Sequence, residues 1–322
     1  MCVPALWMGI FYPILNTIYA ASTPKQTATT VGRFYAANTL GSILGALLAG
    51  FLLIPALGIQ WTLLIITLLI NGGIGCYFLL RSGGAYIKNL AICSIVLLAL
   101  TAWSLQEKYL VGNEEKNADK VLFYKEGLMS TVKVYQKGNY LSMAIDGVEI
   151  ASTKTSLFKK ERVIGHLPFF LDNEIENVLS VGLASGISIG SMTLHKSVEK
   201  IDCVELIKPV FKGAGFFADY NYDLLNHPKL DFYHDDVFSF LKYSDEKYDL
   251  ISSDGKLGTL NQANTTMLSK DYYDLCRASL TDDGLFIQWI PVIAPGRAFE
   301  SIANTLSSSF EHVELFYFYP SD

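Results

Sequence analysis

The chain has 322 residues, of which 51% are hydrophobic and only 17% are charged, which is not the composition of an ordinary soluble protein. This length has room for about two domains. The first 106 residues contain no acid and only four basic residues, so subtracting +4 from the net −6 leaves about −10 for residues 107–322. The second part is therefore acidic and has no basic cluster, which argues against a nucleic-acid partner.

The first part contains four apolar stretches, at residues 3–21, 34–57, 60–80 and 87–105. Each is close to the roughly 20 residues that a helix needs to cross a bilayer. No basic region precedes the first stretch and three more follow it, which argues against a signal peptide. We therefore predict an α-helical transmembrane region at residues 1–106, with about four helices crossing the lipid bilayer.

The charges near these stretches leave the membrane orientation open. The basic residues of the first part fall in the two loops on one face, which favours that face as cytoplasmic. They are Lys25, Arg33, Arg81 and Lys88. Four further lysines follow the last stretch and cancel the bias, namely Lys108, Lys116, Lys120 and Lys125.

The five cysteines do not have the spacing of a zinc site or of a disulfide framework. Cys203 and Cys276 fall in apolar runs, where buried free thiols are expected. Such thiols favour a reducing compartment.

After a polar linker at residues 107–120, the chain alternates apolar and polar residues over 121–155, with turn signals at KGN and DG. This pattern predicts a small antiparallel β unit. Residues 156–322 then alternate helices and strands, beginning with a helix that carries Lys159 to His166. The alternation predicts an α/β Rossmann-like domain with a mostly parallel sheet, in which ligands bind beyond the carboxyl ends of the strands.

The expected strands of this domain lie at residues 178–182, 201–206, 230–236, 248–254, 284–292 and 312–320. Further helices are expected from about residue 186, over 208–225 and over 270–279. The sixth strand ends almost at the last residue, so we expect either a short protein or a fragment that lacks a final strand.

A glycine turn follows the first of these strands, in the stretch VLSVGLASGISIG. Gly182 and Gly186 would let the backbone approach a ligand, and Glu205 lies 23 residues after Gly182. That spacing is close to the offset of roughly 20 residues at which an acid meets a ribose in doubly wound sheets. Ala184 takes the place of the middle glycine of a fuller fingerprint. A Gly-x-x-x-Gly turn by itself fits tight helix packing equally well, so the turn alone leaves a nucleoside site and a packing turn both open.

Three acids, Glu205, Asp236 and Asp254, stand at the ends of successive strands. Any one of them alone is best interpreted as a helix cap or a solvated group. Their occurrence together behind a glycine turn favours a binding site. His166, in the helix before the first strand, is more typical of a structural histidine than of a catalyst.

The order of these segments resembles the spermidine synthase (polyamine aminopropyltransferase) family across about residues 120–319. The resemblance is carried by FYKEG, VKVY, IDG, GHLPFFL, VLSVGLASG, VELIKPV, DDVFSFL, YDLISSD and LFIQWIP. In the first part, VGRFYAANTLGSILGALLAGFLLIPALG resembles the membrane segment of fused, multi-spanning members. The resemblance implies a small β unit followed by a methyltransferase-type Rossmann-like domain.

It also implies roles for individual residues. Glu205 corresponds to the ribose-binding acid, Asp236 to the acid that reaches the adenine amino group, and Asp254 to the acid assigned to the attacking amine. The donor-binding glycine loop corresponds to Gly182, Ala184 and Gly186. The implied donor is decarboxylated S-adenosylmethionine, or S-adenosylmethionine itself, the acceptor is putrescine or a related amine, and no metal is required.

Three positions depart from the family pattern, and all of them belong to the acceptor half of the site. Leu257 replaces the second acid of the DSSDP-like loop, Ile150 replaces a glutamine, and Lys160 replaces a pocket tyrosine. A lysine repels a diamine and a missing acid removes an anchor for one, so these residues argue against putrescine.

We therefore expect a membrane-anchored aminopropyltransferase with Asp254 as the base. The alternatives left open are a transferase acting on another acceptor, and a non-catalytic nucleoside-binding sensor or transporter component. The supply of the donor places the domain on the cytoplasmic side. Self-association into a homo-oligomer is left open.

Overall fold

The structure, a computed structural model, describes residues 17, 27–81, 95, 99, 118–172, 174–254, 266–290 and 296–318. Contacts divide the chain into two units, Met1–Glu107 and Lys108–Asp322.

The first unit is helical. Its described elements are α2 (Thr27–Leu47), the π-helical segment η2 (Leu48–Leu53), α3 (Ile54–Leu57) and α4 (Ile59–Arg81). The π-helical turn precedes Pro55, whose ring cannot continue the α-helical hydrogen-bond ladder, and the N–H of Ile54 reaches back to the carbonyl of Ala49. Gly58, with a φ of 85°, ends this helical run before α4 begins.

Among the described residues, one continuous helix, Val31–Leu57, is long and apolar enough to cross a bilayer by length and composition. The stretch expected at 60–80 is the helix α4, but its described apolar part, Ile59–Leu69, is shorter than a membrane span. The stretches expected at 3–21 and 87–105 lie outside the described residues, except for single positions. One span is thus supported, and the multi-pass arrangement stays a prediction.

The second unit begins with a four-stranded antiparallel sheet in the order β1-β2-β3-β4. Its strands are β1 (Lys120–Glu126), β2 (Thr131–Lys137), β3 (Tyr140–Ile145) and β4 (Val148–Ser152). The turns fall at residues 138–139 and 146–147, where the KGN and DG signals predicted them. Val134 and Met143 pack in one core with Val210 of α9 (Lys208–Ala214), so this sheet is continuous with the interior of the following domain.

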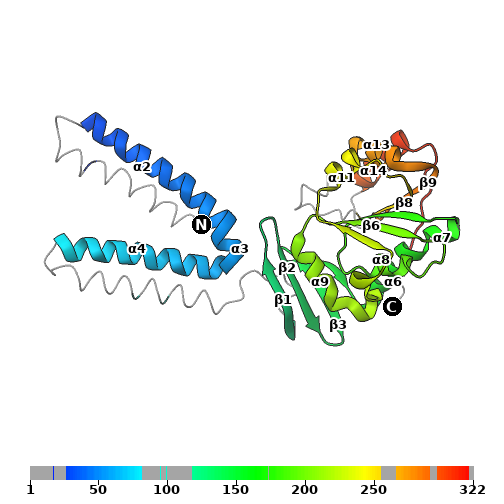
Figure 1. Cartoon of the computed structure of the whole chain (residues 1–322), viewed down its shortest axis with the longest axis horizontal. Helices are drawn as coiled ribbons and strands as arrows, with labels where there is room; N and C mark the ends of the chain where they lie inside the picture. The colour runs from blue at the N-terminus through cyan, green and yellow to red at the C-terminus, as the bar shows by residue number, and fades with distance from the viewer. Residues whose placement is uncertain are drawn as a thin grey trace. The chain divides into compact units, whose positions relative to one another are not determined.

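The following domain is built on a five-stranded parallel sheet with the order β7-β6-β5-β8-β9 (Figure 1). Its strands are β5 (Asn177–Val181), β6 (Lys200–Val204), β7 (Leu230–Tyr233), β8 (Tyr248–Ser253) and β9 (Leu280–Gln288). The strand order runs outward from β5 in both directions, which makes β5 the centre of the sheet. The parallel sheet predicted from the alternation of strands and helices is therefore confirmed.

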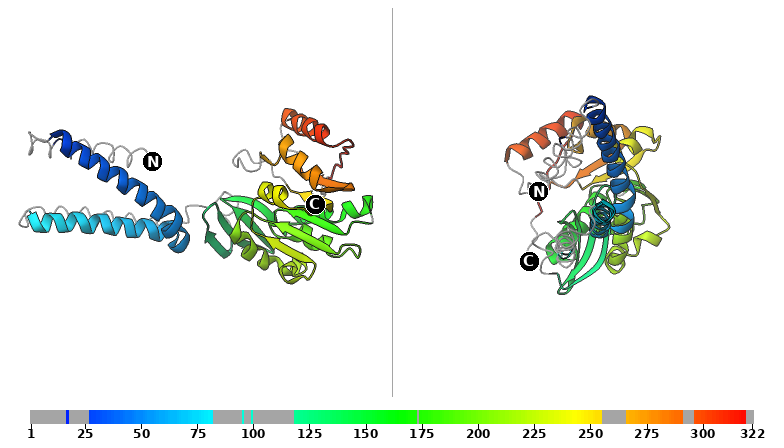
Figure 2. Two further views of the ribbon diagram at one scale, coloured as in Figure 1. Left: turned by 45° about the horizontal axis from the view of Figure 1, so that its top comes forward. Right: turned by 90° about the vertical axis from the view of Figure 1, so that its left-hand side faces the viewer.

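Helices cover both faces of this sheet. On one face lie α6 (Thr155–His166), α8 (Ile187–Met192) and α9, and on the other lie α11 (Val237–Tyr243), α13 (Lys270–Ser279) and α14 (Gly296–Ser309) (Figures 1 and 2). The shorter helical segments are α7 (Pro168–Leu171), η4 (Gly215–Phe217), α10 (Ala218–Asn221) and η5 (Leu224–Asn226). Successive residues of β5 belong to opposite cores, Val178 to the first and Leu179 to the second, because side chains alternate across a strand.

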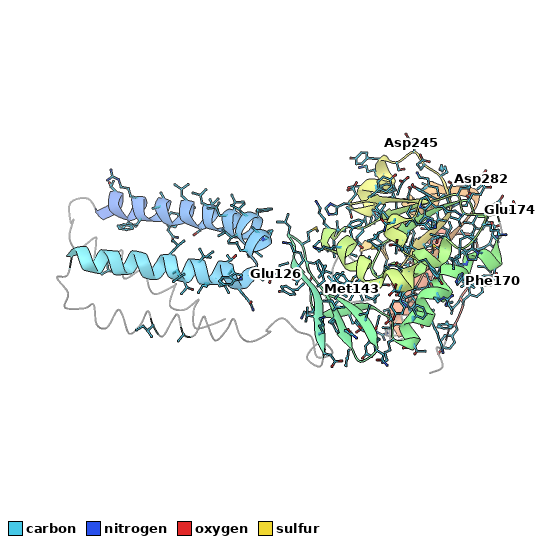
Figure 3. All side chains as sticks on the ribbon, turned by 60° about the horizontal axis from the view of Figure 1, so that its bottom comes forward. Glu126, Met143, Phe170, Glu174, Asp245 and Asp282 are labelled. Atoms are coloured by element: carbon cyan, nitrogen blue, oxygen red, sulfur yellow. The ribbon has the colours of Figure 1, made fainter. Side chains whose placement is uncertain are left out.

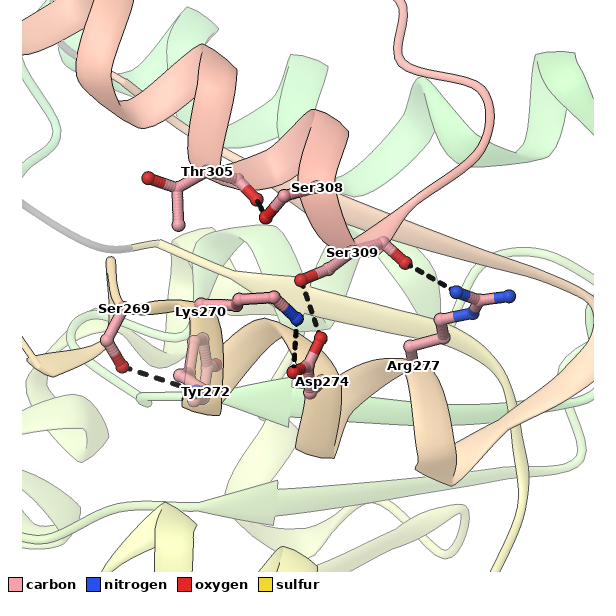
Figure 4. Close-up of polar contacts among 8 residues, drawn as sticks. All are labelled: Ser269, Lys270, Tyr272, Asp274, Arg277, Thr305, Ser308 and Ser309. Atoms are coloured by element: carbon pink, nitrogen blue, oxygen red, sulfur yellow. Dashed lines mark hydrogen bonds and ion pairs between the residues drawn. The ribbon is translucent and has the colours of Figure 1, made fainter.

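Polar contacts join α14 to α13 on the second face (Figure 4). The Asp274 carboxylate accepts hydrogen bonds from Ser309 Oγ at 2.7 Å and from Lys270 Nζ at 2.6 Å, and Arg277 donates to the carbonyl of Ser309 at 3.0 Å. The hydrogen bond from Lys270, together with that from Ser309, lowers the pKa of Asp274. The C-terminal end of α14 is therefore held to α13 by hydrogen bonds as well as by apolar packing.

Three predicted elements differ from the structure. The strand expected at 284–292 is β9, which begins and ends four residues earlier, at Leu280 and Gln288. The helix expected over 208–225 is divided into α9, η4 and α10, and it ends at Asn221 because Tyr222 and Asp223 adopt positive φ values of 61° and 51° that no α-helix continues. The strand expected at 312–320 is not formed over its described residues, 312–318, where Leu315 is 71% exposed. Its alternating apolar pattern predicted a strand, but a strand also requires a neighbour for its backbone hydrogen bonds.

Many acids of this unit lie at its surface. Glu174, Asp245 and Asp282 are exposed and project from its periphery (Figure 3). Glu161 and Glu205, in contrast, are buried. Burying a carboxylate is costly unless it is paired or hydrogen-bonded, so these two acids require such partners.

Candidate active site

The glycine turn connects the central strand β5 to α8. Gly182 has a φ of 89°, and its N–H donates to the carbonyl of Val204 at 2.8 Å, which extends the β5–β6 ladder by one residue. A Cβ built on Gly182 would meet no atom within 4 Å. The backbone of Gly182 therefore borders open space, as a turn that receives a ligand requires.

The other two positions of the turn have different surroundings. A Cβ on Gly186 would lie 2.0 Å from Cδ2 of the fully buried Leu224, so this glycine is required for packing. Ala184 adopts a φ of 47°, which is uncommon for a residue with a side chain. Tight packing thus accounts for Gly186, whereas the open surroundings of Gly182 leave ligand approach there as a prediction.

Glu205 follows β6 directly and holds the glycine turn through its carboxylate. Its Oε2 accepts the backbone N–H of Leu183 at 3.0 Å, and its Oε1 accepts the N–H of Ile207 at 2.8 Å. Each oxygen retains a further lone-pair site for a hydroxyl donor. Burial raises the pKa of Glu205, and the backbone N–H groups that bond to it oppose this rise.

Asp236 follows β7 and caps α11. Its Oδ2 accepts the backbone N–H of Ser239 at 3.3 Å, which is the hydrogen bond of a helix N-cap. The carboxylate is partly exposed rather than buried. Asp236 therefore has the structural role of a cap in this structure, and its role toward a ligand stays a prediction.

Asp254 follows β8 and forms an ion pair with Lys160 of α6, with 3.2 Å between Asp254 Oδ2 and Lys160 Nζ. Lys160 Nζ also lies 3.1 Å from Oε1 of Glu161 and 5.4 Å from the centre of the Trp289 ring. The side chains of Lys160 and Glu161 are 6% and 3% exposed, and that of Asp254 is 25% exposed. Asp254 Oδ1 is buried and has no hydrogen-bond partner among the described residues.

The charges of this cluster keep Lys160 protonated. Burial by itself would lower the pKa of Lys160, but the neighbouring charges of Glu161 and Asp254 outweigh burial and raise it. A protonated lysine in contact with the ring of Trp289 is also a cation–π arrangement. We call Lys160, Glu161, Asp254 and Trp289 the ammonium cluster.

The fold brings the predicted acids to one edge of the sheet. Glu205, Asp236 and Asp254 follow β6, β7 and β8, and parallel strands have their carboxyl ends at the same edge. Of the departures from the family pattern, Ile150 packs against the first core and Leu257 lies outside the described residues.

Sequence reasoning missed Glu161 and Trp289. Glu161 lies in the helix expected around Lys159 to His166, but the sequence does not indicate which face of that helix it occupies, and Trp289 lies within the strand expected at 284–292. The sequence signal that could have indicated Glu161 is an acid directly after Lys160 in an otherwise amphipathic helix.

His166 lies in a separate contact. Its Nδ1 is 2.9 Å from Nε2 of His195, whose ring stacks on Phe169 with 3.8 Å between the ring centres. Burial, followed by the charge of Arg162, lowers the pKa of His166. These contacts favour the structural interpretation of this histidine.

Comparison with known proteins identifies the family. The family model of the spermine/spermidine synthase domain matches residues 157–319, which is half of the chain. The chain belongs to the spermine/spermidine synthase family. The match includes the glycine turn and the three acids at the sheet edge.

Curated relatives in this family are similar over the same part of the chain. The polyamine aminopropyltransferase of Buchnera aphidicola subsp. Schizaphis graminum is 30% identical over 171 residues, which cover 52% of this chain and 59% of the relative. Polyamine aminopropyltransferase 1 of Pseudomonas aeruginosa is 28% identical over 148 residues, covering 45% of this chain and 50% of the relative. The chain thus spans between half and three fifths of these relatives.

Solved structures share the fold. A spermidine synthase in complex with the transition-state analogue AdoDATO matches with a TM-score of 0.53 at 18% identity, over 61% of this chain and 65% of that one. The spermidine synthase of Thermotoga maritima matches with a TM-score of 0.54 at 17% identity, over 65% of this chain and 76% of that one. The spermidine synthase-type Rossmann-like fold expected from the sequence is therefore confirmed.

Proposed function

We propose that this chain is a membrane-anchored transferase that moves the aminopropyl group of decarboxylated S-adenosylmethionine to an amine acceptor. The observation that carries the proposal is the position of Asp254. Its carboxylate follows the strand next to the one that leads into the open glycine turn, and Oδ1 has no hydrogen-bond partner among the described residues. The family of the chain and the names of its relatives support the same activity.

The donor half of the proposed site is formed by Gly182, Glu205 and Asp236. Glu205 is anchored by two backbone N–H groups and keeps acceptor capacity for the ribose hydroxyls. Asp236 is the acid proposed to accept from the adenine amino group. Gly182 offers the open backbone beside which the nucleoside lies, with Ala184 and Gly186 shaping the rest of the turn.

The chemistry requires a base rather than a metal. An aliphatic amine has a pKa near 10, so it binds as an ammonium and must lose a proton before it attacks carbon. A carboxylate beside it orients the amine and accepts the proton. The new bond joins the amine nitrogen to the aminopropyl carbon, the sulfonium carbon–sulfur bond breaks, and methylthioadenosine leaves. Asp254 is the residue to which we assign the proton.

Donor binding and turnover test this proposal separately. Calorimetry with S-adenosylmethionine and with its decarboxylated form would show which donor binds, and binding of neither would refute the proposal. Release of methylthioadenosine in the presence of an amine pool is the expected activity. Asp254→Asn should reduce turnover by a factor on the order of 10²–10⁴ while leaving donor affinity within a few-fold. Unchanged turnover would remove Asp254 from its assigned role.

A second candidate keeps the donor site but changes the acceptor. It is favoured by the ion pair between Lys160 and Asp254, which occupies one oxygen of the proposed base. A transferase that uses S-adenosylmethionine on another acceptor would bind that donor and release S-adenosylhomocysteine rather than methylthioadenosine. A non-catalytic sensor or transporter component would bind a nucleoside and release neither product.

We further propose that the helical first unit anchors the protein in a membrane as a multi-pass region, with the enzymatic unit facing the cytoplasm. Support comes from the span Val31–Leu57, whose apolar stretch is not buried within the described structure. Its exposed apolar side chains include Phe51, which is 69% exposed. Protease accessibility of the enzymatic unit in sealed inside-out and right-side-out vesicles distinguishes the two orientations. Extraction of the full chain by carbonate alone would refute membrane anchoring.

A further inference from the structure

Two segments with an unusual backbone conformation contact each other beside the proposed donor site. Among the described residues, four that are not glycine have positive φ values, and three of the four lie in these segments. Ala184, with a φ of 47°, belongs to the glycine turn, and Tyr222 and Asp223, with 61° and 51°, follow α10 directly. Such values are uncommon for residues with a side chain and persist only where the surrounding structure holds them. We call residues 221–224 the support segment.

The side chain of Asn221 joins the support segment to the glycine turn. Asn221 is 1% exposed, and its Nδ2 donates to the carbonyl of Ser185 at 2.8 Å and to the carbonyl of Ala214 at 3.1 Å. These two hydrogen bonds use both N–H groups of the amide. Its Oδ1 accepts the backbone N–H of Leu224 at 3.4 Å. One buried amide therefore holds the glycine turn, the end of α9 and the support segment together.

Tight packing links the same two segments. A Cβ on Gly186 would lie 2.0 Å from Cδ2 of Leu224, and a Cβ on Gly190 of α8 would lie 2.1 Å from the carbonyl oxygen of Asn221. The support segment thus lies against the glycine turn at one point and against α8 at another. Because a close-packed interior has few free spaces, a displacement of the support segment also displaces the turn.

We propose that Asn221 is a positioning residue that fixes the glycine turn for donor binding. The inference rests on the proposed function, because it concerns the donor half of the same site. Asn221 acts through the turn and not by contact with the donor, since its amide is already engaged by two carbonyl groups. By holding the carbonyl of Ser185, it keeps the turn in the conformation in which Gly182 borders open space. A turn held in its binding conformation loses no affinity to reorganisation.

The experiment replaces the Asn221 amide with a carboxylate of the same shape, Asn221→Asp, in the full chain in detergent. An ionised carboxylate cannot donate, so it would face two carbonyl oxygens without a hydrogen bond. We expect the calorimetric Kd for decarboxylated S-adenosylmethionine to rise about tenfold or more. In the methylthioadenosine assay, KM for this donor should rise by a similar factor. The kcat at saturating donor should fall by less than about threefold, because Asp254 is unchanged.

Two control variants separate donor positioning from charge and from stability. Asn226→Asp makes the same replacement at an exposed position of the neighbouring η5, and should leave Kd within about threefold of native. Tyr248→Phe removes a buried hydrogen bond to Asp202 at the first residue of β8, the opposite end of that strand from Asp254. It should lower Tm and leave Kd within the same range. A rise in Kd as large in Tyr248→Phe as in Asn221→Asp would overturn the inference.

Hydrogen exchange on native protein tests the same coupling without any variant. Saturation with decarboxylated S-adenosylmethionine should slow exchange of backbone amides in the glycine turn and in the support segment together. Slower exchange in the turn alone would overturn the inference while the proposed function stands. An unchanged Kd in a folded Asn221→Asp variant would do the same. Failure of S-adenosylmethionine and of its decarboxylated form to bind native protein would overturn the proposed function and the inference together.

Discussion

The backbone N–H of Leu183 donates to Glu205 Oε2 over 3.0 Å, which joins the glycine turn after β5 to the end of β6. The same carboxylate accepts from Ile207 at 2.8 Å. Glu205 is therefore a structural organiser of the turn as well as the proposed acceptor for ribose hydroxyls. Its substitution should affect donor binding through both roles.

We predict that Glu205→Gln weakens donor binding by about 10- to 100-fold. Glutamine has one acceptor oxygen and no charge, so it cannot keep both backbone hydrogen bonds and also accept from a ribose. A hydrogen bond to a charged group contributes about 1.5–3 kcal/mol, and 1.4 kcal/mol is tenfold in affinity. Calorimetric Kd values for S-adenosylmethionine measure the effect. The exposed Glu199→Gln is the control, and equal Kd values for the two variants would contradict the role of Glu205.

The two glycines of the turn should respond differently to alanine. Gly186→Ala places a methyl group against the buried Leu224, and such overpacking costs about 1–3 kcal/mol, or a fall in Tm of several degrees. Gly186 has a φ of 75°, so this variant also carries the cost of a positive φ. Gly182→Ala meets no atom and adds only the cost of a positive φ, about 1–2 kcal/mol. For each variant we compare the loss of donor affinity with the fall in Tm. We expect the ratio of affinity loss to Tm loss to be larger for Gly182→Ala than for Gly186→Ala. Equal ratios in the two variants would refute the separation of roles.

The pair His166 and His195 should make stability depend on pH. Burial lowers the pKa of both rings, with further contributions from Arg162 at His166 and from His166 at His195. A histidine with a lowered folded-state pKa binds fewer protons when folded, so its stabilising contribution is complete above about pH 6.5 and is lost as pH falls through the folded-state pKa. Lys229, which donates to the carbonyl of His195, adds positive charge nearby.

Urea unfolding midpoints between pH 5 and 8 measure this dependence. As the pH is lowered below about 6.5, we expect the urea midpoint of native protein to decrease. The midpoint of His195→Gln should decrease less over the same pH range. The exposed His312→Gln should leave the slope unchanged. Equal slopes in native protein and His195→Gln would show that the pair does not control the effect.

Asp202 on β6 is 1% exposed and accepts a hydrogen bond from the Tyr248 hydroxyl on β8 at 2.8 Å. Burial and the hydrogen bond with Asp202 raise the pKa of Tyr248, so the hydroxyl is a permanent donor. Tyr248→Phe leaves a buried carboxylate oxygen with one donor fewer. We expect a loss of about 1–3 kcal/mol in the free energy of unfolding, measured by urea titration. Tyr243→Phe, at a position that is 79% exposed, should change this free energy by less than about 0.5 kcal/mol.

Much of the fold could be predicted from local pattern. The helix expected over 270–279 is α13, and the strand expected at 178–182 is β5, one residue earlier. These elements have strong periodicity and clear ends. The strand expected at 312–320 had the pattern but is not paired over its described residues, because pairing depends on a neighbouring strand that local pattern does not specify.

The candidate site divides in the same way. Glu205 and Asp254 could be found because they directly follow strands, and Asp236 because it lies shortly after one, and parallel strands bring their ends to one edge. Lys160 could be recognised as unusual, but its partner could not. Lys160 and Asp254 are separated by 94 positions and belong to different elements. Only the packing of α6 beside the end of β8 brings them together.

The sequence by itself determined the parallel sheet, the glycine turn and the three acids, because strand periodicity and the position after a strand are local properties. Tertiary structure decided how the acids are engaged. It showed that Gly186 is required for packing, that Glu205 holds the turn, and that Lys160 neutralises part of the Asp254 charge. The charge of a site is a sum over groups that only the folded chain brings within ion-pair distance.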